Sequence, residues 1–319
     1  MKGLGSFIPP VITVLPASTG SGGIVRLGQG GPLLQDLPGG WRSLLAADID
    51  NNLILPQATA WTTPPAGNLA IVAAPVAGQP QLSFTTPDGV HAELQTAMWA
   101  DVDLLVSGGA TYNQIGTGSV SVAAGTAGAI ASTSYRTSLV RTVHTSAATA
   151  GSAQGVRIAT ANRWFGNAAG LGGFHAVIRH ALTLLAGHQA FVGQGPAATL
   201  AGEPTALVNM LGIGADAADT NLFLMHKAAT GTATKVDTGL AKTTADVLRL
   251  TLYAPPNSTS ATVQLYNETT RAQVGQWTVT TNLPANTAFM APQAQVRNGA
   301  TTTACAIEVI RIRSGAPAR

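Results

Sequence analysis

Residues 247–266 read VLRLTLYAPPNSTSATVQLY, and this stretch decides the fold class. Apolar and polar residues alternate over 247–253 and again over 261–266, which is the two-residue period of half-buried β-strands. The residues between them, PPNS at 255–258, are types that favour turns. The stretch therefore predicts two antiparallel strands joined by a tight connection.

Segments of the same kind recur on both sides of this pair, separated by turn residues at the regular interval typical of an antiparallel sandwich or barrel. The last segment alternates cleanly, with Ile310 and Ile312 on the face opposite Arg311 and Arg313. We expect strands near 134–145, 155–161, 173–182, 188–193, 207–214, 220–227, 233–238, 246–254, 260–267, 273–281, 289–296 and 304–313. The chain is therefore expected to be all-β, with a jelly-roll or lectin-like antiparallel β-sandwich over 98–319 whose last strand returns to the middle of a sheet.

A smaller unit precedes this domain. Residues 61–94 read WTTPPAGNLAIVAAPVAGQPQLSFTTPDGVHAEL, with alternating runs at 69–73 and 82–85 on either side of a turn. A second turn, TPDG at 86–89, places Pro and Gly where a type I turn requires them. We expect a β-hairpin connector module over 46–97. Because isolated ribbons are marginal in water, a neighbouring domain or further copies of the module should cover it.

The order PAGNLAI at 65–71, LSF at 82–84 and PDG at 87–89 resembles short β-modules near the N-terminal parts of tailed-bacteriophage fibre, spike and head-fibre proteins. Proteins of this kind are typically homotrimers with an N-terminal anchor on the virion and a C-terminal β-sandwich at the tip. The resemblance implies a virion structural protein that is a homotrimer. It also implies binding to other virion proteins of the head, portal or tail, and a tip that contacts a host surface glycan.

Residues 1–45 are expected to form an extended N-terminal arm, because prolines and glycines interrupt them too often for a helix or a long strand. Only the run WRSLLAA at 41–47 favours one or two helical turns. The apolar islands of the arm need a partner surface, which is how an anchoring segment binds. The residues expected to anchor it to the virion are Phe7, Ile8, Val11, Ile12, Val14 and Leu15.

Charge is scarce and scattered. Charged residues make up 10% of the chain, against about 25% in typical soluble domains, and such a surface favours burial in an assembly. The net charge is +3, but the basic residues stand singly, so no nucleic-acid partner is expected. Arg311 and Arg313 are expected at a solvated strand edge. No apolar run is long enough to cross a bilayer, so no membrane insertion is expected.

No catalytic motif stands out. The acids of the large domain lie mostly beside turn residues, where a carboxylate caps a turn without being desolvated. His175 and His180 are an odd number of positions apart on one expected strand, so they should face opposite sides and share no metal. Cys305 has the apolar neighbours of a core residue. We expect a protein that is not an enzyme and that uses no cofactor and no metal.

An aromatic face beside an amide is what weak sugar binding needs. The expected loop RWFGN at 163–167 supplies both, so Trp164, Phe165 and Asn167 are the residues expected to contact glycan, whereas Trp277 is expected in the core. Two alternatives to a fibre or spike stay open. One is a capsid decoration (cement) protein whose arm runs over neighbouring capsid subunits, and the other is a secreted carbohydrate-binding module with an exposed aromatic platform.

Overall fold

The computed structural model describes residues 125–315 throughout, and before residue 125 it describes only the backbone of strands β1 to β11. The chain forms two compact units, one of residues 1–75 and 80–92 and the other of residues 76–79 and 93–319. Strands β1 to β5 pair in sequence order as one sheet, and β6 to β8 pair as another. Their bounds are β1 Val11–Ile12, β2 Ile24–Leu27, β3 Leu33–Leu37, β4 Gly40–Ala47, β5 Leu53–Ile54, β6 Ala70–Val76, β7 Gln79–Thr85 and β8 His91–Glu93.

The arm expected over 1–45 thus contains strands that pair with one another, and β4 crosses its expected end. The helical turns expected at 41–47 are wrong, because this segment is strand β4. Its backbone pairs with β3, for example Trp41 with Asp36, and this hairpin pairing outweighs the weak local helix preference. Of the expected anchor residues, Val11 and Ile12 form β1, whereas Phe7, Ile8, Val14 and Leu15 lie outside the described residues. The anchoring role stays a prediction.

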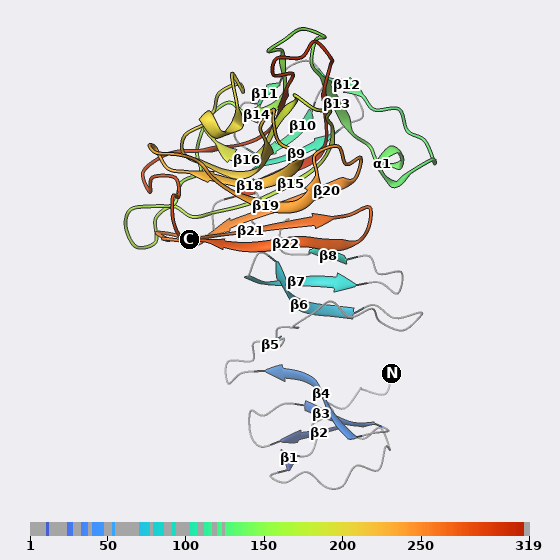
Figure 1. Cartoon of the computed structure of the whole chain (residues 1–319). Helices are drawn as coiled ribbons and strands as arrows, with labels where there is room; N and C mark the ends of the chain where they lie inside the picture. Colours follow the sequence, from blue (N-terminus) through green and yellow to red (C-terminus); the bar gives the residue numbers. More distant parts are fainter. Residues whose placement is uncertain are drawn as a thin grey trace. The chain divides into compact units, whose positions relative to one another are not determined.

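The larger unit is a sandwich of two antiparallel sheets (Figure 1). The front sheet has the order β10-β9-β24-β15-β20-β21-β22, with β13 also paired to β24 and β12 to β13; the back sheet has the order β11-β14-β23-β16-β17-β18-β19. The front strands are β9 Val102–Val106, β10 Tyr112–Gly116, β12 Thr126–Ala127, β13 Thr142–Thr145, β15 Phe174–Thr183, β20 Val247–Ala254, β21 Ala261–Asn267, β22 Ala272–Val279 and β24 Ala306–Gly315. The back strands are β11 Val120–Val122, β14 Ala153–Ile158, β16 Gln189–Gly195, β17 Met210–Ala215, β18 Asn221–Lys227, β19 Thr234–Ala241 and β23 Ala291–Arg297.

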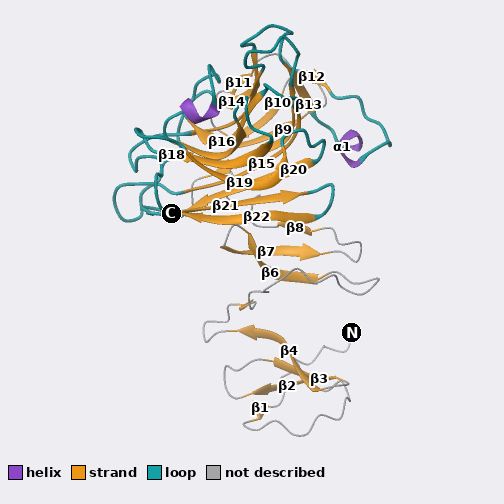
Figure 2. Cartoon of the chain, in the orientation of Figure 1, coloured by secondary structure: helices purple, strands orange, loops and turns teal. Residues whose placement is uncertain are grey.

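Alternation along the strands builds the core between these sheets. Leu250 and Val263 of the front sheet and Val192 and Ile213 of the back sheet belong to one buried apolar cluster. Figure 2 shows how strands dominate the described chain; the helical segments within 125–315 are α1 (Tyr135–Ser138) and the 3-10 turn η1 (Pro204–Ala206). The prediction of an all-β antiparallel sandwich is confirmed.

The strands expected from residue 155 onward are all present, which confirms the period-two interpretation. The expectation for 134–145 is half right. Strand β13 covers its second part, but Ser134 caps α1 in a reciprocal capping box with Thr137, a signal that strand periodicity does not contain.

The last strand, β24, lies between β15 on one side and β9 and β13 on the other, so its predicted return to the middle of a sheet is confirmed. For the same reason the expectation that Arg311 and Arg313 lie at a solvated strand edge is wrong. Arg311 is paired with Arg179 of β15 and with Leu105 of β9.

Candidate functional site

Three loops meet at one end of the sandwich. They connect β14 to β15, β20 to β21 and β22 to β23, and the strand registers bring them together, since Phe174 pairs with Ala254 and Ala261 with Val279. Backbone hydrogen bonds then join the loops. The amide of Asn257 donates to the carbonyls of Phe165 (2.8 Å) and Leu171 (2.9 Å).

The loops also pack closely at Gly166. Its N–H donates to the carbonyl oxygen of Asn286 at 3.1 Å. Its φ of 93° lies in the left-handed region, and a Cβ at this position would stand 1.9 Å from the Leu171 carbonyl oxygen. Only glycine fits there, so the glycine at position 166 is what allows the loops to pack this closely.

A cavity of about 240 Å³ opens between the three loops. Asn257, Thr259 and Asn286 are exposed at it, and Leu283 is partly exposed. Its lining comprises Phe165, Gly166, Asn257, Ser258, Thr259, Leu283, Pro284 and Asn286. Amides, hydroxyls and an apolar wall therefore converge on one small space.

The two asparagine side chains of the cavity are available to a ligand. Neither the Asn257 nor the Asn286 side-chain amide hydrogen-bonds to another residue in the range 125–315. Ser258, in contrast, is used within its own loop, since its hydroxyl donates to the Ser260 carbonyl (2.8 Å) and accepts from the Ser260 amide (3.0 Å). The loop thus fixes the backbone beside Asn257 and leaves the amide group for external contacts.

Trp164 lies on the loop between β14 and β15 but does not line the cavity. Its ring lies against Phe289, with 5.3 Å between ring centroids and a tilt of 31°. Trp164 is partly exposed and Phe289 is 55% exposed, so the pair forms an aromatic surface on two of the cavity loops.

The glycan contact expected of Phe165 stays a prediction, because Phe165 lines the cavity but little of its ring is exposed. Phe165 is 1% exposed and packs edge-on against Phe174 in the core, because neighbouring residues of an extended segment face opposite ways and Trp164 takes the outer side. Asn167 is exposed on the loop but does not line the cavity. Trp277 packs against the core cluster, as expected.

Sequence reasoning missed Asn257, Asn286 and Phe289. The sequence marks Asn257 only as a turn residue, and the strand expected to include Phe289 begins instead at Ala291. The isolated bridge between Arg163 and Met290 brings Phe289 next to Trp164. Nothing local in the sequence marks that long-range pairing.

The loop with Trp164 is anchored at its base by Arg163. Arg163 is 3% exposed, and its guanidinium donates from Nε to the Ser314 hydroxyl (2.9 Å) and from Nη2 to the Ser314 carbonyl (3.1 Å). Ser314 belongs to β24 in the front sheet, so the loop that carries Trp164 is attached to the centre of the fold.

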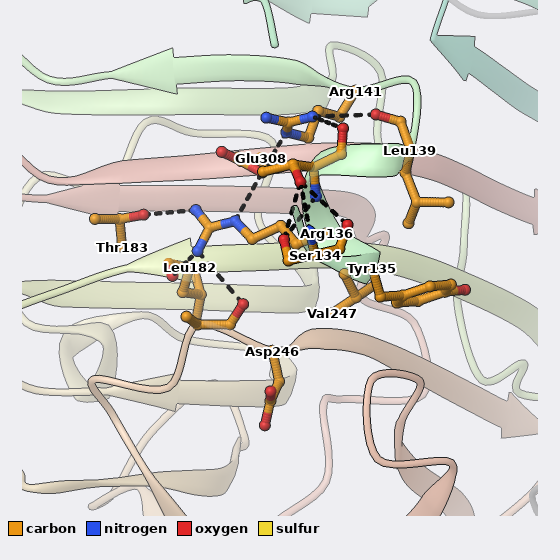
Figure 3. Close-up of polar contacts among 12 residues, drawn as sticks. Ser134, Tyr135, Arg136, Leu139, Arg141, Leu182, Thr183, Asp246, Val247 and Glu308 are labelled. Atoms are coloured by element: carbon orange, nitrogen blue, oxygen red, sulfur yellow. Dashed lines mark hydrogen bonds and ion pairs between the residues drawn. The ribbon is translucent and has the colours of Figure 1, made fainter. Parts of the chain in front are cut away.

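Carboxylates in the described part of the chain hold the fold together. Figure 3 shows Glu308 between two arginines; its carboxylate lies 2.9 Å from Nε of Arg136 and 2.7 Å from Nε of Arg141. Glu268 forms an ion pair with Arg179 at 2.6 Å and accepts from the Tyr135 hydroxyl at 3.1 Å. Burial, followed by the charge of Glu268, raises the pKa of Tyr135.

The remaining acids within 125–315 are engaged in the same way. Their partners are the Ala217 amide for Glu203, Lys235 for Asp216 and Asp219, Asn221 for Asp237, and Asn267 for Asp246. No acid lines the cavity. Within the same range no three His, Cys, Asp or Glu residues gather as metal ligands, and no helix is long and apolar enough to cross a membrane.

The histidines of β15 are buried rather than poised for chemistry. Burial lowers the pKa of His180 to about 4, and burial together with the charge of Arg313 lowers the pKa of His175 to about 4. Both imidazoles are therefore neutral near pH 7 and behave as core side chains.

No family model matches the chain, and no curated protein matches it either. Solved structures with a similar fold include peanut lectin in complex with a 9mer peptide, at 12% identity over 63% of this chain and 89% of that chain with a TM-score of 0.40. A carbohydrate esterase from the Shiga toxin-encoding bacteriophage phi24B matches at 17% identity over 69% and 99% with a TM-score of 0.39. The CBM2 module of the evolved Dit of Lactobacillus casei BL23 phage J-1 matches at 10% identity over 56% and 77% with a TM-score of 0.38. At such identities and TM-scores these likenesses assign no function, and the proposals below rest on the residues of this chain.

Proposed function

We propose that this chain is a fibre or spike protein of a bacteriophage virion whose β-sandwich binds a host surface glycan and does not cleave it. The observation that carries the binding role is the cavity between the three loops, where the Asn257 and Asn286 amides meet an apolar wall. The virion assignment rests on the sequence resemblance of residues 65–89 to fibre and spike modules.

The chemistry of the cavity suits a sugar. An asparagine amide offers two donors and one acceptor group, which matches the paired donor and acceptor character of sugar hydroxyls. Binding pockets combine a few such polar groups with apolar walls, and here Leu283 and Pro284 supply the wall. The aromatic surface of Trp164 and Phe289 on the same loops gives a longer glycan a second place to contact.

The placement of the acids supports binding without hydrolysis. Most glycoside hydrolases use two carboxyl groups that flank the scissile bond. The acids within 125–315 are instead engaged by arginine, lysine, asparagine or backbone groups, and none lines the cavity.

A second candidate is a secreted carbohydrate-binding module, because the partly exposed Trp164 and the exposed Phe289 form the aromatic platform that such a module presents. A third candidate is a capsid decoration protein, whose N-terminal arm would run over neighbouring capsid subunits. Electron microscopy of particles carrying a labelled copy of this chain distinguishes the three candidates. Label on a projecting fibre or spike supports the first proposal, label on the capsid surface supports a decoration protein, and no label on any particle supports a secreted module.

We expect the full chain to be a homotrimer. In the sheet of β6, β7 and β8 the third strand has only 3 residues, so most of the sheet is a two-stranded ribbon, which is marginal by itself, and charged residues make up only 10% of the chain. Light scattering on the full chain should report a mass three times that of the protomer. A stable, soluble monomer at micromolar concentration would contradict the trimer while leaving the glycan-binding role untouched.

We expect Trp164→Ala to weaken adsorption of the protein to host cells by about tenfold, the factor that corresponds to losing about 1.4 kcal/mol of contact. Phe289→Ala should act similarly, because the two rings lie against each other. A pull-down of labelled protein with intact cells measures the effect.

The matched control is Leu185→Ala. Leu185 is 52% exposed and follows the opposite end of β15, so it presents an apolar side chain far from the cavity loops. This control should adsorb like the unmodified protein, and all three variants should keep nearly the same melting temperature. If Trp164→Ala and Leu185→Ala adsorb equally well, the aromatic surface has no part in binding.

A further inference from the structure

We infer that the cavity selects a single uncharged sugar unit that carries a methyl group, as an N-acetyl or a 6-deoxy substituent. This inference rests on the proposed glycan-binding function and narrows its ligand. Three features of the cavity carry it: its lack of charge, its apolar wall and its two asparagine amides.

Charge is the first feature. No Lys, Arg, Asp or Glu lines the cavity. A sugar carboxylate that enters it would lose hydration without meeting a cation, which is costly. The lining therefore disfavours uronic acids and other acidic sugars.

The apolar wall is the second feature. Leu283 is partly exposed and packs against the core cluster, and Pro284 stands beside it. Phe165 also lines the cavity and is almost fully buried. A methyl group placed against this wall leaves water, whereas a hydroxyl at the same position would lose its hydrogen bonds to water. The wall thus favours a methyl-bearing sugar over its parent hexose.

The amides are the third feature. Asn257 and Asn286 come from different loops, and backbone hydrogen bonds at Asn257 and between Gly166 and Asn286 fix where each residue stands. Asn257 has a φ of 53°, a left-handed conformation that asparagine tolerates. The amides can therefore bind hydroxyl or acetamido groups without rearranging the loops.

The size of the cavity limits the ligand to one unit. Its volume of about 240 Å³ is below the range of roughly 300–1,000 Å³ typical of pockets for drug-sized ligands. One sugar ring can enter, while the rest of a longer glycan remains outside, where the Trp164–Phe289 surface lies on the adjoining loops.

Saturation-transfer NMR titrations of the full chain test this inference with two matched pairs and one acidic sugar. The pairs are N-acetylglucosamine against glucose and L-rhamnose against L-mannose, and the acidic sugar is glucuronic acid. We expect the methyl-bearing member of at least one pair to bind about fourfold more tightly than its parent, the factor for burying one methyl group. Glucuronic acid should bind most weakly. The pair that shows the preference identifies an N-acetyl or a 6-deoxy source.

Three variants assign the preference to the cavity. Leu283→Asn should remove the difference within the pair by making the wall polar, and Asn286→Ala should weaken both members of the pair. Asn286 is exposed and its contact with Gly166 uses the backbone carbonyl, so Asn286→Ala keeps the fold even if Leu283→Asn does not. Leu185→Ala, at the opposite end of the sandwich and outside the cavity, is the control and should bind like the unmodified chain.

Equal affinities within both pairs, or tighter binding of glucuronic acid, would overturn the inference. The same holds if none of the five sugars binds. Screening the chain on a microbial glycan array then separates the two proposals, because binding to other glycans leaves the proposed function standing. If no glycan binds at all, the proposed function fails as well.

Discussion

Replacing Glu308 by Gln is expected to lower the free energy of unfolding by about 3–5 kcal/mol, because removing one partner of a buried ion pair leaves the other charge uncompensated. Glu308 is 7% exposed and lies between the guanidinium groups of Arg136 and Arg141. Arg141 also donates to the carbonyls of Ala129, Thr137 and Leu139. The substitution therefore weakens the attachment of 128–141 to the front sheet.

Urea denaturation followed by tryptophan fluorescence measures this loss. The matched control is Asp237→Asn, the same carboxylate-to-amide change on the exposed strand β19, where Asp237 accepts from Asn221 and from the Gly239 amide. The control should change stability far less than Glu308→Gln. A Glu308→Gln protein as stable as the unmodified one would show that the two arginines find other partners.

Acidification is expected to destabilise the sandwich between about pH 6.5 and pH 4. The pKa values of His175 and His180 are lowered from 6.5 to about 4 in the fold, mainly by burial. As the pH falls below 6.5, the unfolded chain binds protons that the folded chain does not, so unfolding becomes more favourable. The two histidines together should cost roughly 3 kcal/mol per pH unit over most of this range, a total on the order of 6 kcal/mol by pH 4. Above pH 6.5 both imidazoles are neutral in the folded and the unfolded chain, so this loss of stability is absent there.

Urea midpoints measured from pH 7.5 down to pH 4 follow this loss. His180→Leu removes one titrating group, so the dependence on pH should become about half as steep. His180 is suited to this test because it is fully buried and its Nε2 has no hydrogen-bond partner within the described residues. A stability that stays constant from pH 7 to pH 4 would show that these imidazoles are not held neutral by the fold.

The sandwich could be predicted from the sequence because its strands alternate and turn residues separate them. Segments such as 247–253 and 261–266 predict strands from their own alternation, and the structure confirms β20 and β21 there. The central place of β24 was expected from the jelly-roll or lectin-like architecture, in which the last strand returns to the middle of a sheet. Arg311 and Arg313 misled, because polar residues on a strand face do not tell whether the strand lies at the edge or in the middle of a sheet.

The candidate site could be predicted only in part. Trp164 was identified from its loop, but its partner Phe289 lies far along the chain and meets it through a single bridge between Arg163 and Met290. Asn257 and Asn286 converge only because the three loops lie at the same end of the sandwich. The register between strands that are distant in the sequence brings these loops together, and local sequence does not show that register.

Retention of fluorescently labelled host envelope polysaccharide on the immobilised full chain, followed by measurement of the length of the eluted polysaccharide, tests glycan binding without cleavage most directly. We predict that the unmodified chain retains the polysaccharide, that Asn286→Ala retains much less, and that the eluted polysaccharide keeps its length. No retention, equal retention by Asn286→Ala, or a shortened polysaccharide would contradict a binding cavity without hydrolytic activity.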